Sequence, residues 1–124
     1  MIYRILLAVF IISAFSSTAF AQTGYRLHEG SIEGAAYAVA EPTEWNGTLV
    51  LVAHGLRPPN APLVHGFNPE YQAYRYLLQD GWMVAATSYR RNGVIISDAV
   101  TDIDNLRGYI SEQFGVPKRV LVDG

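Results

Sequence analysis

The sequence contains no cysteine among its 124 residues. A chain without cysteine has no disulfide framework, no thiolate nucleophile and no thiolate ligand for a metal, so its stability must come from a hydrophobic core. Histidine is scarce as well, because only His28, His54 and His65 occur, and no pair has the short H-x-x-x-H spacing of a helical zinc site. The residues therefore imply neither a metal nor an organic cofactor.

Basic residues are outnumbered: nine Lys and Arg stand against eleven Asp and Glu, which gives a formal net charge of −2. Proteins that bind nucleic acid usually carry a basic patch or stripe, and this chain has none. The composition argues against nucleic acid as a partner.

The N-terminal apolar run, from Ile5 to Phe15, is shorter than the roughly 20 residues that a membrane-spanning helix needs. Arg4 precedes this run, and Ala19-Phe20-Ala21 after it matches an A-x-A cleavage site. Together these features predict a secretory signal peptide over residues 1–21, with a membrane anchor as the alternative. We expect cleavage after Ala21 and a secreted or periplasmic domain over residues 22–124, with no membrane contact after cleavage.

Apolar segments predict the strands of a sheet. Residues 48–53 (TLVLVA), 82–89 and 119–123 are mostly apolar, as strands buried in a parallel sheet are. We expect the first of them to lie between the other two. Two shorter segments, Tyr25 to His28 and Ala35 to Ala40, predict an antiparallel pair at the edge of the sheet. An Asn46-Gly47 turn precedes the central strand; Asn46-Gly47-Thr48 also matches a glycosylation sequon, but the turn alone explains these residues.

Two helices are predicted between the strands. Asn68 and Pro69 have the form of an N-cap followed by a first-turn proline, so a helix should run from Pro69 to about Gln79. A second helix should start near Ser97 or Asp98, with its apolar face formed by Ala99, Ile103, Leu106, Ile110 and Phe114. Asp102 and Asp104 are expected on its solvated side. The order of elements predicts an α/β fold with a mostly parallel sheet and two crossover helices.

This pattern resembles the α/β hydrolases over nearly all of residues 25–124. The resemblance rests on a strand that ends at His54-Gly55, the segments Asp80-Gly81-Trp82 and Ser88-Tyr89-Arg90, and Gly115-Val116-Pro117 before the last strand. It implies the N-terminal half of such a fold, in which Gly124 would be the first glycine of the nucleophile elbow G-x-S-x-G. The serine, acid and histidine of the triad would then lie beyond residue 124.

The resemblance also assigns one functional group to this chain. The backbone N–H of Leu56 would be the first oxyanion-hole donor, with His54 and Gly55 shaping the turn that presents it. The loop residue His65 and the strand-end residue Arg90 are candidates to meet the substrate, although a solvated histidine and a surface charge explain them as well. The implied activity is hydrolysis of an ester, amide or peptide bond of a small-molecule or peptide substrate.

The alternative is a small α/β protein that binds a ligand at the same strand ends without chemistry. Under the hydrolase hypothesis the 124-residue chain should be inactive and should fold poorly alone, because Val120 to Val122 would form an exposed, apolar sheet edge. Neither hypothesis distinguishes an esterase from a lipase or a peptidase, since specificity depends on loops outside these residues.

Export gives the first prediction. Expressed with its own leader, the protein should be found outside the cytoplasm with Gln22 as its first residue, because signal peptidase cleaves after the small residue that ends an A-x-A site. Mass spectrometry of the N-terminal peptide measures this. An intact Met1 end on a membrane-embedded product would contradict the prediction.

Overall fold

The computed structural model describes residues 24–124, so the predicted signal peptide lies outside the described residues. Five strands form one mixed sheet in the spatial order β1-β2-β4-β3-β5. The elements are β1 (Tyr25–Ile32), β2 (Ala35–Pro42), β3 (Thr48–Val52), α2 (Gln72–Gln79), β4 (Met83–Thr87), α3 (Ile96–Phe114) and β5 (Arg119–Asp123). The α/β fold class, the antiparallel opening pair and the two helices predicted from the sequence are confirmed.

Strand β3 is the middle strand of the parallel part of the sheet. It pairs in parallel with β4 on one side, where Val50 lies beside Val84, and with β5 on the other, where Val50 lies beside Leu121. The side chains of β3 from Thr48 to Leu51 are buried, because a helix covers each face of the sheet nearby. The predicted position of this strand between its two parallel neighbours is confirmed.

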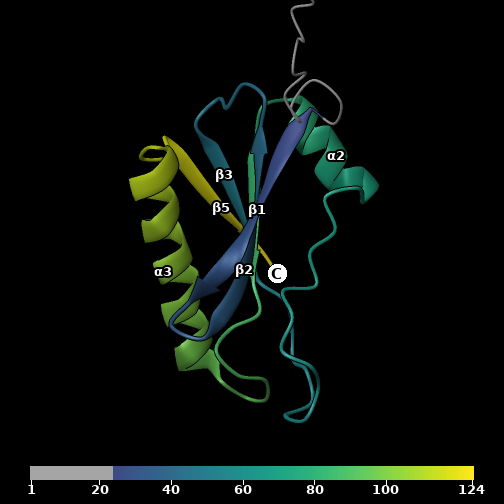
Figure 1. The fold of residues 1–124 in the computed structure, drawn as a ribbon, viewed down its shortest axis with the longest axis vertical. Helices are drawn as coiled ribbons and strands as arrows, with labels where there is room; N and C mark the ends of the chain where they lie inside the picture. Colours follow the sequence, from purple (N-terminus) through teal and green to yellow (C-terminus); the bar gives the residue numbers. More distant parts are fainter. Residues whose placement is uncertain (1–23) are drawn as a thin grey trace, which may run out of the picture.

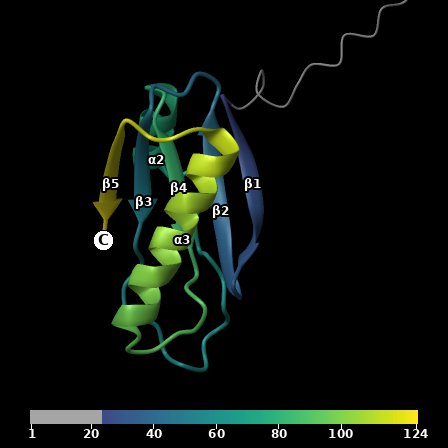
Figure 2. The same ribbon diagram turned by 90° about the vertical axis from the view of Figure 1, so that its left-hand side faces the viewer.

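The two helices lie on opposite faces of the sheet, which gives three layers (Figure 1). Helix α3 packs through Leu106 and Ile110 against one face, where Leu49 and Met83 are buried. Helix α2 packs through Leu78 against Ala40 and Val84 on the other. Figure 2, turned by 90°, shows that β1 and β5 form the two edges of the sheet. Within residues 24–124, no helix is long and apolar enough to cross a membrane.

The opening hairpin is longer than the sequence predicted. Strand β1 continues through Gly30 to Ile32, and the turn consists of Glu33 and Gly34, which both have positive φ. Two such residues form the tight turn that matches the twist of an antiparallel pair. Gly30 is therefore a strand residue, and the ring of Tyr37 lies so close that a Cβ on Gly30 would be 2.7 Å from the Tyr37 hydroxyl oxygen.

The first helix begins later than predicted. Asn68 accepts a hydrogen bond from the N–H of Glu70, and its carbonyl accepts one from the N–H of Tyr71, so residues 68–71 form a separate turn. Helix α2 then starts at Gln72 rather than at Pro69. The prediction took this pattern as the N-cap and first turn of the helix itself, so it placed the helix start three residues early. Tyr71, the residue before the helix, is exposed.

Helix α3 starts at Ile96, within two residues of the prediction, and carries one unexpected buried charge. Asp102 is buried, whereas Asp104 is exposed as predicted. The physical reason is helical spacing, because Asp102 lies four residues before Leu106 and eight before Ile110 and so shares their row on the packed face. The expectation of two solvated acids is wrong for Asp102.

The turn before β4 should be sensitive to a single methyl group. Gly81 has φ of +84°, and a Cβ there would lie 2.6 Å from the carbonyl oxygen of Glu44. Gly81→Ala should lower the stability of the domain by at least about 1–2 kcal/mol, which is the cost of a left-handed conformation alone. Thermal melting followed by circular dichroism measures the effect.

Gly108 in α3 provides the matched control, because a Cβ there meets no atom within 4 Å. Gly108→Ala should raise stability by up to about 1 kcal/mol, since alanine favours a helix interior over glycine. A Gly81→Ala protein that melts at or above the wild-type temperature would contradict the argument.

Candidate functional site

The carboxyl ends of β3 and β4 meet at one edge of the sheet, because the two strands are parallel. His54, Gly55 and Leu56 follow β3 directly, and Ser88 and Tyr89 follow β4. A hollow of about 330 Å³ lies between the two loops that start there. In open α/β sheets this edge is where ligands bind. Residues that line the hollow include His54, Leu56, Tyr89, Asn92, Val94 and Ile96.

The ring of His54 joins the two strand ends. It stacks on the ring of Tyr89 with 4.1 Å between centroids, and its Nε2 lies 3.0 Å from the carbonyl oxygen of Ser88. Its Nδ1 lies 2.8 Å from the carbonyl oxygen of Gly55. A neutral imidazole has a single N–H, so it donates to one of these two carbonyls at a time. Both ring nitrogens therefore face backbone carbonyls, an arrangement that orders the turn and does not activate a hydroxyl.

Tyr89 is held in an unfavourable backbone conformation at the end of β4. Its φ is +61°, a region that costs a residue with a bulky side chain on the order of 1–3 kcal/mol. Its N–H donates to Thr87 Oγ1, and its hydroxyl donates to the carbonyl oxygen of His54 over 2.9 Å. Burial raises the pKa of Tyr89, so the hydroxyl keeps the proton that it donates. These contacts fix the strand end beneath His54.

Leu56 is one of the residues that line the hollow. Among residues 24–124, no hydrogen bond engages the N–H of Leu56, and its side chain is 75% exposed. The end of β5 reaches the same edge, since the N–H of Ala53 donates to the carbonyl of Asp123 over 2.7 Å and Gly124 lies against Ala53. Leu56 thus lines the hollow, and the end of β5 contacts the chain three residues before Leu56.

Two loops form the walls of the hollow and are tied to each other. The N–H of Gly93 donates to the carbonyl of Arg57, and Asn92 Nδ2 donates to the carbonyl of Ala61. Asn92 Oδ1 is buried and has no hydrogen-bond partner within residues 24–124. An unpartnered buried amide oxygen is costly in a folded protein. Asn92 thus keeps an unused acceptor beside the hollow.

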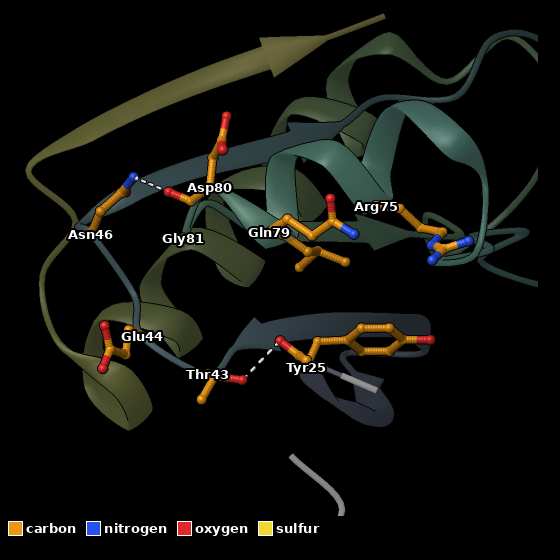
Figure 3. A pocket seen from close by; sticks show the side chains of 10 residues that line it. Tyr25, Thr43, Glu44, Asn46, Arg75, Gln79, Asp80 and Gly81 are labelled. Carbon is orange, nitrogen blue, oxygen red and sulfur yellow. Dashed lines mark hydrogen bonds between the residues drawn. The ribbon is translucent and has the colours of Figure 1, made fainter. Parts of the chain in front are cut away.

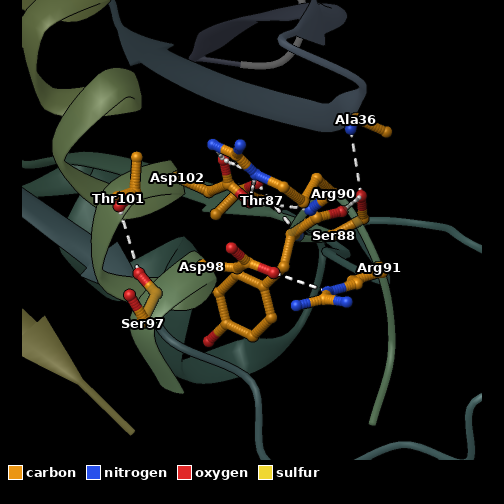
Figure 4. A network of polar contacts seen from close by, with 10 residues as sticks. Ala36, Thr87, Ser88, Arg90, Arg91, Ser97, Asp98, Thr101 and Asp102 are labelled. Carbon is orange, nitrogen blue, oxygen red and sulfur yellow. Dashed lines mark hydrogen bonds and ion pairs between the residues drawn. The ribbon is translucent and has the colours of Figure 1, made fainter. Parts of the chain in front are cut away.

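Neither serine near this edge is placed as a nucleophile. The hydroxyl of Ser88 is fully buried, where it accepts from the N–H of Ala36 and donates to the carbonyl of Tyr89. Ser97 lies in the first turn of α3, with its carbonyl bound by the Thr101 hydroxyl. Figure 4 shows the two serines apart from each other. The Ser88 hydroxyl has its partners in the backbone of Ala36 and Tyr89, and it is the Ser88 carbonyl that contacts His54.

The two substrate-loop candidates from the sequence do not line the hollow. His65 accepts the N–H of Phe67 at Nδ1, so its proton is on Nε2, which donates to Glu29 on β1 over 2.8 Å. Arg90 turns toward α3 and pairs with Asp102, with 2.8 Å between Nη2 and Oδ1, and its own N–H donates to Oδ2 (Figure 4). The structure gives both side chains partners within the fold.

The neighbour of Arg90 lines the hollow instead. Arg91 lines the hollow while it is paired with Asp98. The apolar residues Val94 and Ile96 also line the hollow, with most of their surface exposed. Sequence analysis assigned neither Tyr89 nor Asn92 a role at the site. The available signal for Asn92 was the dipeptide Asn92-Gly93 in the loop after β4, where α/β folds place binding residues.

A second hollow, of about 560 Å³, lies at the amino ends of β3 and β4, opposite the first (Figure 3). Two of its polar side chains bind the backbone: Thr43 donates to the carbonyl of Gly24, and Asn46 donates to the carbonyl of Asp80. These bonds hold the turns together at the end of the sheet where α/β folds do not keep their chemistry.

Comparison of the sequence with models of protein families and with curated proteins finds no match. The resemblance to the α/β hydrolases therefore rests on the residues quoted above and on the arrangement of the elements.

The Arg90–Asp102 pair should stabilise the candidate site. The Asp102 side chain has no exposed surface and the Arg90 side chain is 35% exposed, so Asp102→Ala leaves the N–H and guanidinium of Arg90 without their acceptor. We expect a loss of about 2–3 kcal/mol. Urea unfolding of the variant and the wild type measures the loss.

Asp104→Ala is the control, because the Asp104–Arg107 pair has the same 2.8 Å separation but is solvated. Its effect should stay within about 0.5 kcal/mol. Equal losses in the two variants would show that burial does not set the strength of these pairs.

Proposed function

We propose that this chain forms the oxyanion-binding part of an exported serine hydrolase of the α/β-hydrolase type, which cleaves an ester, amide or peptide bond. The observation that carries the proposal is the meeting of three features at one sheet edge. They are the open N–H of Leu56, the hollow, and the end of β5 beside Ala53. A nucleophile that follows Gly124 would start from this edge.

The role of the Leu56 N–H follows from the charge that develops in the reaction. Attack of a serine oxygen on a carbonyl creates a negative charge on the carbonyl oxygen, and a fixed N–H that faces it lowers the barrier. The strand end is rigid at this point, because His54 and Tyr89 bind each other by ring stacking and by the hydroxyl bond to the His54 carbonyl. The donor would thus be oriented before the substrate arrives, which is the condition for electrostatic catalysis.

The hollow favours an uncharged group on the substrate. Leu56, Val94 and Ile96 present apolar surface to it, and the side chain of Arg91 is already paired with Asp98. The unpartnered Asn92 Oδ1 is the one buried acceptor beside it that is unused within residues 24–124. An apolar acyl or alkyl group that carries a hydrogen-bond donor would fit this lining.

A second candidate is a small ligand-binding protein without chemistry. The observation that favours it is that the described residues form the hollow by themselves and supply its apolar walls and its unused acceptor. The two candidates differ in one respect that can be tested, because a hydrolase needs the serine of G-x-S-x-G next to Gly124 and a binding protein does not.

The coding sequence downstream of Gly124 should read x-S-x-G, in frame or after a frameshift. In the protein that carries this serine, Leu56→Pro should lower kcat by about 10²–10³, because proline has no N–H to face the oxyanion. Hydrolysis of p-nitrophenyl acetate gives kcat and KM, and a fluorophosphonate probe counts the active sites. The 124-residue chain alone should show neither turnover nor labelling.

Leu56→Ala is the matched control, since it shortens the same side chain but keeps the N–H, and its kcat should remain near that of the wild type. Equal kcat values for the two variants would remove Leu56 from the oxyanion hole. Labelling of Ser88 or Ser97 in the 124-residue chain would show that the nucleophile lies elsewhere.

A further inference from the structure

Strand β5 is an edge strand that neither helix covers. Its side chains are exposed on both faces of the sheet, with Val120 at 37%, Leu121 at 41% and Val122 at 62% exposure. Figure 2 shows β5 at the margin of the sheet, while α3 lies over the strands toward the other side. An exposed apolar edge of this kind is a template for pairing with another strand.

The opposite edge is different in kind. Strand β1 carries the charged residues Arg26 and Glu29 within its length, and charged side chains inside an edge strand oppose strand addition. Only Arg119 and Asp123, at its two ends, are charged in β5. The sheet therefore has one protected edge and one edge suited to pairing.

The order of residues in β5 is complementary to itself when reversed. In an antiparallel pair centred on Leu121, Arg119 lies opposite Asp123 of the second strand, Val120 lies opposite Val122, and Leu121 lies opposite Leu121. Opposite charges and β-branched pairs across a sheet are both favourable. Centring on Val120 or Val122 instead would leave the charges without opposite partners.

The backbone hydrogen bonds permit this register. The N–H of Arg119 donates to Gly47 and the carbonyl of Asp123 accepts from Ala53, so residues 119, 121 and 123 direct their backbone groups toward β3. Val120 and Val122 then direct theirs outward, because the direction alternates along a strand. Pairing Val120 with Val122 of the second strand joins outward groups to outward groups, which gives four backbone hydrogen bonds in all.

We infer that the 124-residue chain forms a symmetric dimer in which the β5 strands of two copies pair antiparallel about Leu121. The two sheets join into one of ten strands, and a two-fold axis makes the interface closed. In the single chain Arg119 lies over its own Trp82, 5.2 Å from the ring centroid, and its Nη2 donates to Thr48 Oγ1 over 3.4 Å. This long side chain must leave both contacts to reach Asp123 of the second copy. The competing occupant of the edge is a further strand of the sheet, which the proposed hydrolase would add after Gly124. The dimer is therefore inferred for the 124-residue chain and not for that longer protein.

Sedimentation velocity over a range of concentrations tests the inference on the 124-residue chain, expressed with its leader and purified. We expect a monomer–dimer equilibrium for the wild type. Val122→Pro should weaken it roughly 10- to 100-fold, because two of the four outward hydrogen bonds are lost while the pairing with β3 is kept. Val122→Thr is the matched control, since it keeps the N–H and the branched shape, and it should remain a dimer.

Charge reversal gives a test that does not depend on how the proline variant folds. Arg119→Asp and Asp123→Arg should each weaken the dimer, because like charges then face each other, and the double variant should restore it. A wild type that is monomeric throughout, or that grows into open-ended aggregates, would overturn the inference. So would a Val122→Pro protein as dimeric as the wild type, or a double variant that stays as weak as the single ones.

Discussion

Parallel pairing of β3 with both β4 and β5 is the constraint on which the rest of the structure depends. Because the three strands run the same way, their carboxyl ends lie at one edge, and the chain must return across a face of the sheet after β3 and after β4. The first return includes α2 and the second is α3, on opposite faces. The three-layer arrangement and the hollow at the strand ends are consequences of that one pairing.

Elements with a strong local pattern could be predicted from the sequence. The valine-rich strands and the apolar row of α3 were placed within a few residues, because burial of one strand or one helix face imposes a period that the sequence displays. Boundaries set by a single contact could not be placed. Gly30 lies inside β1 because Tyr37 packs over it, and α2 starts late because Asn68 forms a turn of its own.

The residues of the candidate site also include some that the sequence could predict and some that it could not. His54, Gly55 and Leu56 could be located because they directly follow a strand whose course was predictable. The side chains of His65 and Arg90 could not, since their partners come from elsewhere: Glu29 precedes His65 by 36 residues, and Asp102 follows Arg90 by 12. Electrostatic partners of this kind depend on which element lies beside which, and that is decided by packing rather than by local composition.

Within residues 24–124, two surfaces for which binding is proposed break local rules of stability. At the carboxyl edge, Tyr89 has a positive φ, Asn92 keeps an unpartnered oxygen and Leu56 is exposed. At β5, apolar side chains and outward backbone groups face water. A protein tolerates such locally unfavourable features at sites where a bound ligand or partner relieves them. A ligand in the hollow would engage the first set, and an added strand would engage the second. The ordered core between them, centred on β3, is what keeps both in place before either is occupied.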